Sequence, residues 1–370
     1  MKTLVGGTFI ALTMLVMSCD TNPDITPDQD LLPDNFRVDI PSSIANEDFV
    51  TNGRMRGRSK EDELNGNDIY QHLGTFIAIG DGAGELVEDL IGGIQKHQIN
   101  RVLSLSFISD DDGRVKNMIV TSDAEFEGRT WQYQLTLTDA ESEGNPDGGK
   151  ALQVFWNHQQ PIEGISIIKL YNIDRTKHAD AGDAIFRIDY SEVSDQGYDA
   201  EMEVRIAGLP MPAPLEDPYA VSSLWMFAGK KGDVVDVYGN SNHPNAIFFS
   251  GAVGFDWAFA ASGDDANDIG VAEVGLPPSN LDSNDRNELL VENSIKNVFT
   301  NEINAVWPGL DPELLANYLQ NTEAPGYFSS NGFIAGGESP GPAWDALAAR
   351  ITTLTPYSPL AVSNLTIQFK

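Results

Sequence analysis

The stretch FIAIGDGAGELVEDL, residues 76–90, decides how the first part of the chain folds. Around it, apolar or small residues recur at alternating intervals of four and three, at Ile69, Leu73, Phe76, Gly80, Ala83, Val87, Leu90 and Ile94. This spacing places them on one face of an α-helix, and it continues through the glycine cluster without a change of phase. We therefore predict a helix, capped at Asn67 or Asp68 and interrupted at most near Asp81, whose small residues let a sheet approach closely.

The same glycines suggest a phosphate-binding loop as the alternative. GDGAG contains G-x-G, but the dinucleotide fingerprint G-x-G-x-x-G requires its third glycine where Glu85 stands, and Gly84 lies one residue early. A carboxylate at that position repels a pyrophosphate, and the fingerprint also requires parallel strands joined by helices. We therefore predict a packing helix and no cofactor.

Residues 101–276 are dominated by short segments in which apolar and polar residues alternate, as in residues 131–137 and 198–206. Alternation with a period of two is typical of β-strands. Clusters of Asp, Asn and Gly, which favour tight turns, separate these segments at residues 110–113, 145–149, 194–197, 229–233 and 263–265. Antiparallel strands joined by hairpins are the expected result.

The remaining segments complete a prediction of one α+β domain over residues 36–370. We expect a strand at 36–41, helices at 283–304, 312–319 and 344–351, a glycine-rich loop at 326–341 and a final strand at 360–369. The predicted fold is a large antiparallel β-sheet of about 10 to 12 strands, for which a curved half-barrel is one form. A long N-terminal helix and the C-terminal helices would cover it.

The first residues, MKTLVGGTFIALTMLVMSC, form a short apolar stretch after a single Lys and end at Cys19, which is the one cysteine of the chain. The stretch is too short to span a membrane and is typical of a secretory signal. Val16-Met17-Ser18-Cys19 resembles the lipobox of bacterial lipoproteins. The resemblance implies a signal peptide at 1–18, cleaved before Cys19, and lipidation of Cys19; the alternative is an ordinary signal peptide with a coincidental cysteine.

Residues 19–35 contain the acidic, proline-rich sequence DTNPDITPDQDLLPDN directly after Cys19. This composition indicates an extended tether and is similar to that of envelope lipoproteins of the Bacteroidetes type. We expect a cell-envelope protein attached through Cys19, at the outer membrane or the cell surface rather than the inner membrane. Asp20 leaves the choice of membrane open, because it is an inner-membrane retention signal in enteric bacteria.

The charge of the chain excludes one class of partner. Its formal net charge is −32 at pH 7. Nucleic-acid affinity depends mostly on basic residues that neutralise phosphates, so we predict no nucleic-acid partner.

The sequence contains no complete catalytic or metal-binding motif. Gly337-Glu-Ser339-Pro-Gly341 matches G-x-S-x-G, but Pro340 lacks the amide proton that an oxyanion hole needs, and the last histidine, His243, lies upstream. Ser166-x-x-Lys169 lies in an apolar strand without an accompanying Lys-Thr-Gly. The five histidines have no metal-ligand spacing, and no aspartate cluster fits a calcium loop in register.

Aromatic residues supply the candidate binding residues. Trp225 with Phe227, and Phe255 with Trp257, alternate with Met226 and Asp256, so each pair is a candidate for an exposed or pocket-lining face. We predict a noncatalytic binding or accessory role. The alternatives are a glycan-binding protein with aromatic platforms, a carrier of lipid or acyl chains with a cavity between sheet and helix, and a hydrolase; a glycan, a lipid or an envelope protein is the expected partner besides the membrane.

Overall fold

The computed structural model describes residues 36–45, 66–95, 102–213, 217, 219–247 and 253–370. The predicted signal peptide, Cys19 and the tether lie outside these residues.

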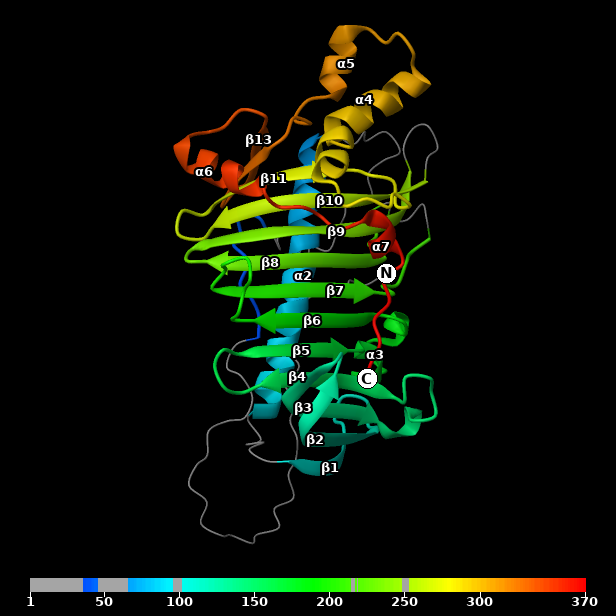
Figure 1. Cartoon of the computed structure of the whole chain (residues 1–370). Coiled ribbons are helices and arrows are strands. Elements are labelled where there is room, and N and C mark those ends of the chain that lie inside the picture. Colours follow the sequence, from blue (N-terminus) through cyan, green and yellow to red (C-terminus); the bar gives the residue numbers. More distant parts are fainter. Residues whose placement is uncertain (1–35, 46–65, 96–101, 214–216, 218, 248–252) are drawn as a thin grey trace.

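The described chain forms an α+β fold built on one open antiparallel sheet (Figure 1). Its 13 strands are hydrogen-bonded in the order of the sequence, so each strand forms a hairpin with the next, and β1 and β13 are the two edges. The strands are β1 (Leu103–Ile108), β2 (Val115–Phe126), β3 (Arg129–Asp139), β4 (Lys150–Asn157), β5 (Glu163–Ile168), β6 (Ile185–Ser191), β7 (Ala200–Ala207), β8 (Ser223–Lys231), β9 (Val234–Ile247), β10 (Val253–Asp264), β11 (Ile269–Gly275), β12 (Gly326–Ser329) and β13 (Gly332–Gly336).

Several helices accompany the sheet. They are α2 (Gly66–Gln95), η1 (Ala140–Ser142), α3 (Leu170–Ile173), η2 (Ala179–Ala181), the π-helical turn η3 (Asn287–Glu292), α4 (Ile295–Val306), α5 (Pro312–Tyr318), α6 (Pro342–Ile351) and α7 (Pro359–Ser363). No helix in the described residues is long and apolar enough to cross a membrane.

The large antiparallel sheet and the long helix are confirmed, while four local predictions are wrong. Residues 36–41 are extended but pair with no strand, and Phe36 and Val38 pack into the core instead. The segment 283–304 is divided into η3 and α4, because Ser294 rather than Ser283 caps α4 by accepting the Asn297 amide proton. Residues 326–336 form the hairpin β12–β13, not a loop. Residues 360–369 begin in α7 and contain no strand.

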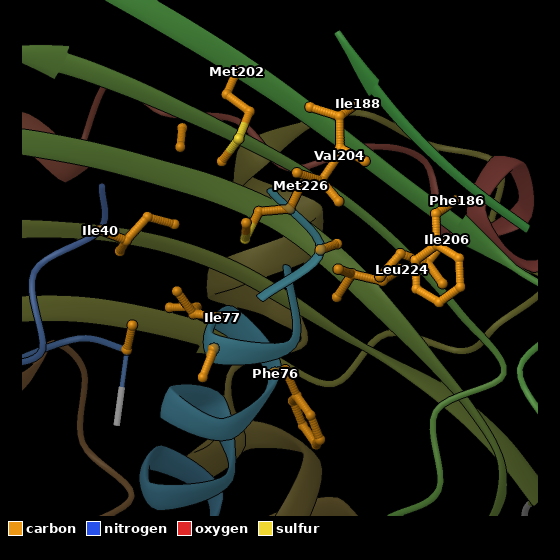
Figure 2. Packing of buried hydrophobic residues seen from close by; sticks show 14 of the residues in the cluster. Ile40, Phe76, Ile77, Phe186, Ile188, Met202, Val204, Ile206, Leu224 and Met226 are labelled. Atoms are coloured by element: carbon orange, nitrogen blue, oxygen red, sulfur yellow. The ribbon is translucent and has the colours of Figure 1, made fainter. Parts of the chain in front are cut away.

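Helix α2 is continuous through Asp81 and crosses one face of the sheet (Figure 1). Its buried side chains belong to the largest core cluster, and Figure 2 shows Ile77 on the side of the helix toward Met226 of β8. The contact is close because of the glycines. A Cβ atom on Gly80 would lie 2.4 Å from Met226 Cε.

The opposite face of the sheet, here called the outer face, is covered in separate patches. Over β10 and β11, Leu347 and Ile351 of α6 pack with Leu289 and Leu290 of η3. Over β4 and β5, the C-terminal residues Ile367 and Phe369 pack on a small apolar cluster. Helix α7 contacts β8 and β9 between these patches. The chain therefore buries apolar residues on both faces of its sheet.

Two glycines of α2 give a matched test of the close contact. We expect Gly80→Val to destabilise the fold by about 1–3 kcal/mol, because the added atoms collide with the side chains of β8. A Cβ atom on Gly82 would meet no atom of another segment within 4 Å, so the matched Gly82→Val should stabilise the helix slightly, by up to about 0.5 kcal/mol. Urea denaturation followed by circular dichroism measures both; a stabilising Gly80→Val would contradict the packing described.

Candidate functional site: an aromatic pocket on the outer face

The four predicted aromatic residues divide between the two faces of the sheet. Trp225 and Phe227 alternate with core residues of β8 and lie on the outer face, where they meet other aromatic rings. Phe255 and Trp257 of β10 lie on the α2 side. Trp257 is fully buried, with its ring 5.2 Å from that of Phe76, and presents no face to solvent. Phe255 is also buried, although it lines a separate open pocket of about 440 Å³ together with residues of α4.

A cluster of rings forms on the outer face around Trp225. Tyr357 stacks on one face of the indole, with ring centroids 4.3 Å apart, and the Arg205 guanidinium lies 4.8 Å from the indole centroid. The indole Nε1 donates a hydrogen bond of 2.9 Å to Glu203 Oε1. Tyr238 lies 5.6 Å from Tyr357, measured between ring centroids. These contacts fix the orientation of Trp225. Because Tyr357 and Arg205 already cover the indole, the rings form a rigid wall and offer no free face for stacking.

This wall borders a pocket of about 470 Å³, which we call the aromatic pocket. Its lining consists of Trp225, Tyr238, Asp282, Ser283, Asn284, Thr355, Pro356, Tyr357, Ser358 and Ala361. Burial raises the pKa of both tyrosines, so their hydroxyls stay protonated and can donate hydrogen bonds. The lining thus combines aromatic rings with hydroxyls, one amide and one carboxylate, and contains no lysine or arginine.

One wall of the pocket is held by a run of polar residues on β9. The sequence YGNSNHPN, residues 238–245, puts polar side chains in the middle of a buried strand. Asn240 Oδ1 accepts the backbone N–H of Tyr357 at 2.8 Å, and Ser223 of neighbouring β8 donates to the carbonyl oxygen of Val362 at 2.8 Å. The sequence reasoning missed Tyr238 and Tyr357, although the polar run on β9 was a signal that this strand binds a distant segment.

A second polar pair on β9 lies on the α2 side. Ser241 Oγ is 2.7 Å from His243 Nε2, and His243 Nδ1 is 3.1 Å from the Tyr219 carbonyl oxygen. Both side chains are fully buried, and burial lowers the pKa of His243 to about 3. A base of such low pKa is poorly matched to proton transfer near neutral pH. We therefore interpret the pair as a satisfied core histidine.

The other candidates for chemistry remain apart. Ser339 donates its hydroxyl proton to the Gly341 carbonyl oxygen within its own turn. Among the described residues, no group of three or more His, Cys, Asp or Glu side chains is placed to hold a metal ion.

The buried histidine predicts how stability depends on pH. The folded-state pKa of His243 lies below the ordinary value, so the unfolded chain binds the extra proton between about pH 3 and pH 6.5. The contribution of His243 to stability should therefore fall as the pH falls through this window, with a slope approaching about 1.4 kcal/mol per pH unit. His243→Gln, which keeps a donor and an acceptor, should reduce the slope.

Urea titrations of both proteins at several pH values between 4 and 7 measure this difference. Equal slopes in the wild type and in His243→Gln would contradict the buried, neutral state of the histidine.

Comparison of the chain with models of protein families, with curated proteins and with solved structures finds no match. The functional interpretation therefore depends on the residues of this chain and on their geometry.

Proposed function

We propose that this is a lipid-anchored protein of the bacterial cell envelope that binds a neutral saccharide in the aromatic pocket without altering it chemically. The composition of the pocket lining carries the proposal. The aromatic wall offers apolar contact to the C–H groups of a sugar at the side of the pocket, while short hydroxyl, amide and carboxylate side chains suit its hydroxyl groups.

The geometry of the pocket supports binding of a small, rigid ligand. Its volume of about 470 Å³ is within the range usual for small-molecule sites. Arg205 and Tyr357 already hold the indole of Trp225 in place, so little side-chain freedom is lost when a ligand binds. A preformed wall favours affinity for this reason.

The charge of the protein supports a neutral ligand. Asp282 is the one charged residue of the lining, and the whole chain has a formal net charge of −32. Both would repel a phosphate or a carboxylate. The carboxylate of Asp282 can instead accept hydrogen bonds from sugar hydroxyls.

The other functions considered from the sequence find less support. A carrier of acyl chains, for which a curved half-barrel would be suited, needs space between the sheet and the long helix. At Gly80 and Gly84 the helix is in direct contact with side chains of the sheet and of the N-terminal segment. The Ser241–His243 pair is fully buried, so it gives the hydrolase alternative no accessible nucleophile.

The position of Phe36 fits an anchor on the opposite side of the sheet from the pocket. Its backbone N–H donates to Glu88 of α2, and its ring stacks on Tyr190 of β6 at 5.8 Å between centroids. Phe36 thus lies on the α2 side, whereas the pocket lies on the outer face. A tether that precedes Phe36 would therefore join the described domain on the side away from the pocket.

The anchor is tested by lipid labelling of the full chain in bacterial cells. We expect an alkyne-bearing fatty acid to be incorporated into the wild-type protein and not into Cys19→Ala. Mass spectrometry should find the mature N-terminus at Cys19. Labelling of Cys19→Ala, or an unmodified wild-type N-terminus, would argue for an ordinary signal peptide.

The binding site is tested by isothermal titration calorimetry with a panel of neutral mono- and oligosaccharides. We expect Trp225→Ala to weaken binding by about 10- to 100-fold, as removal of a central aromatic contact costs about 1–3 kcal/mol. Trp307→Ala is the matched control, because Trp307 is exposed after α4 and does not line the pocket.

Three results would overturn the saccharide assignment. The first is that no saccharide of the panel binds, and the second is that wild type and Trp225→Ala bind with equal affinity. The third is that a simple alkylammonium salt binds more tightly than every sugar, because the pocket would then select a cation. Appearance of shortened oligosaccharides during the titration would instead contradict the noncatalytic role.

A further inference from the structure

A carboxyl group is buried on the outer face of the sheet and is linked through one asparagine to helix α7. Asp256 of β10 lies on the outer face and is fully buried. Its Oδ1 accepts a hydrogen bond of 2.8 Å from Asn242 Nδ2 of β9. Asn240 and Ser279 are its other polar neighbours, but within the described residues no donor is aligned well enough with Oδ2 for a hydrogen bond. A buried carboxylate oxygen without a donor is costly, whereas a protonated carboxyl carries no charge and its O–H group can donate to a neighbouring oxygen.

The same asparagine connects Asp256 to the C-terminal segment, which we define as residues 355–363. Asn242 Nδ2 lies 3.0 Å from Ser363 Oγ in α7 and 2.8 Å from Ser279 Oγ in the loop that follows β11. Since an amide group has two protons, it can donate to two of its three neighbours at a time. The state of Asp256 therefore affects how Asn242 holds Ser363.

The C-terminal segment supplies half of the aromatic pocket. Thr355, Pro356, Tyr357, Ser358 and Ala361 all belong to the lining. Any movement of the segment away from β9 would separate Tyr357 from Trp225 and widen the pocket.

Only neutral groups surround the buried carboxyl. Facing it are Asn240 and Asn242 from β9, Ser279 from the loop and Ser363 beyond Asn242 in α7, and no charged side chain of the described residues perturbs it. Burial without a cation raises the pKa of Asp256 to about 8. Asp236, also buried on this face of β9, differs because Arg350 pairs with it.

We propose that Asp256 is a proton-operated latch: the C-terminal segment stays seated on β9 while this carboxyl is protonated, and it lifts when the carboxyl ionises and becomes hydrated. The consequence for ligand binding depends on the proposed function of the pocket. The movement of the segment itself does not.

The direction of the pH effect follows from proton linkage. The seated state has the raised pKa, whereas lifting exposes Asp256 and returns its pKa towards the ordinary value near 4. Between these values the seated state binds one more proton than the lifted state. Lifting should therefore become more favourable as the pH rises, by up to about 10-fold per pH unit, and should level off above about pH 8.

Hydrogen–deuterium exchange of the whole mature chain, read by mass spectrometry from pH 5 to pH 9, tests the latch. Asp256→Asn keeps the shape and stays neutral, so wild type and variant are compared at each pH to cancel the intrinsic pH dependence of exchange. The backbone N–H groups of Tyr357, Leu360 and Val362 are bonded in the seated state and serve as reporters.

We expect exchange in residues 355–363 to accelerate with pH in the wild type relative to Asp256→Asn, with no such difference across β8 and β10. Asp345→Asn, which removes an exposed carboxylate of α6, should behave as the wild type. Identical pH profiles for wild type and Asp256→Asn would overturn the latch, and so would acceleration spread over the entire sheet, because that indicates global unfolding.

Calorimetry with a saccharide that binds then separates the two proposals. We expect its affinity for the wild type to fall between pH 6 and pH 8.5 and to stay constant for Asp256→Asn. A pH-independent affinity in both proteins would overturn the latch and leave the binding function intact. If no saccharide binds, the exchange experiment still decides the latch.

Discussion

The direct contact of a long helix with an open sheet is the interaction on which the rest of the structure depends. In a sheet whose strands pair in sequence order, the backbone hydrogen bonds between strands connect only neighbouring segments of the chain. Helix α2 contacts strands as distant as β6 and β13, and so joins hairpins that do not pair with one another in the sheet. Such contact requires small residues on the helix, because Gly80 and Gly84 lie against methionine side chains of β8 and β7. The cost of glycine in a helix interior is thus offset by burial along the whole face.

The C-terminal residues have the corresponding role on the outer face. Arg350 of α6 pairs with Asp236 of β9, α7 contacts β8 and β9, and the amide of Lys370 donates to Gln153 of β4. The chain therefore returns across strands that were formed far earlier in the sequence. The aromatic pocket lies where this returning segment meets β8 and β9, so its existence depends on the completed fold.

The sequence predicts those helices and hairpins that are determined by local periodicity and turn residues. The helix over residues 76–90 and the hairpins of the sheet are local patterns, and the structure confirms them. The hairpin β12–β13 could not be predicted, because its strands are rich in glycine. Gly326 is required there because the ring of Tyr70 leaves no room for a Cβ atom. The alternation in residues 360–369 reflects Ile367 and Phe369 packing on one side of an extended tail, which needs no strand partner. Trp225 could be nominated from its strand, but Tyr357 could not, because 132 positions of sequence separate the two and only tertiary packing unites them.

The polar run on β9 connects stability with the candidate function. Buried amides and carboxyls contribute little to stability when satisfied and cost much when left unpaired, so a core strand gains nothing from Asn240 and Asn242 by hydrophobic burial. Asn240 and Asn242 instead position the C-terminal segment, because each offers hydrogen-bonding atoms that only one register of this segment can use. An apolar strand at this place would hold residues 355–363 by nonspecific packing and would tolerate several registers. The polar strand gives up some hydrophobic stabilisation and in return fixes the ring of Tyr357 against Trp225, which places a wall of the pocket.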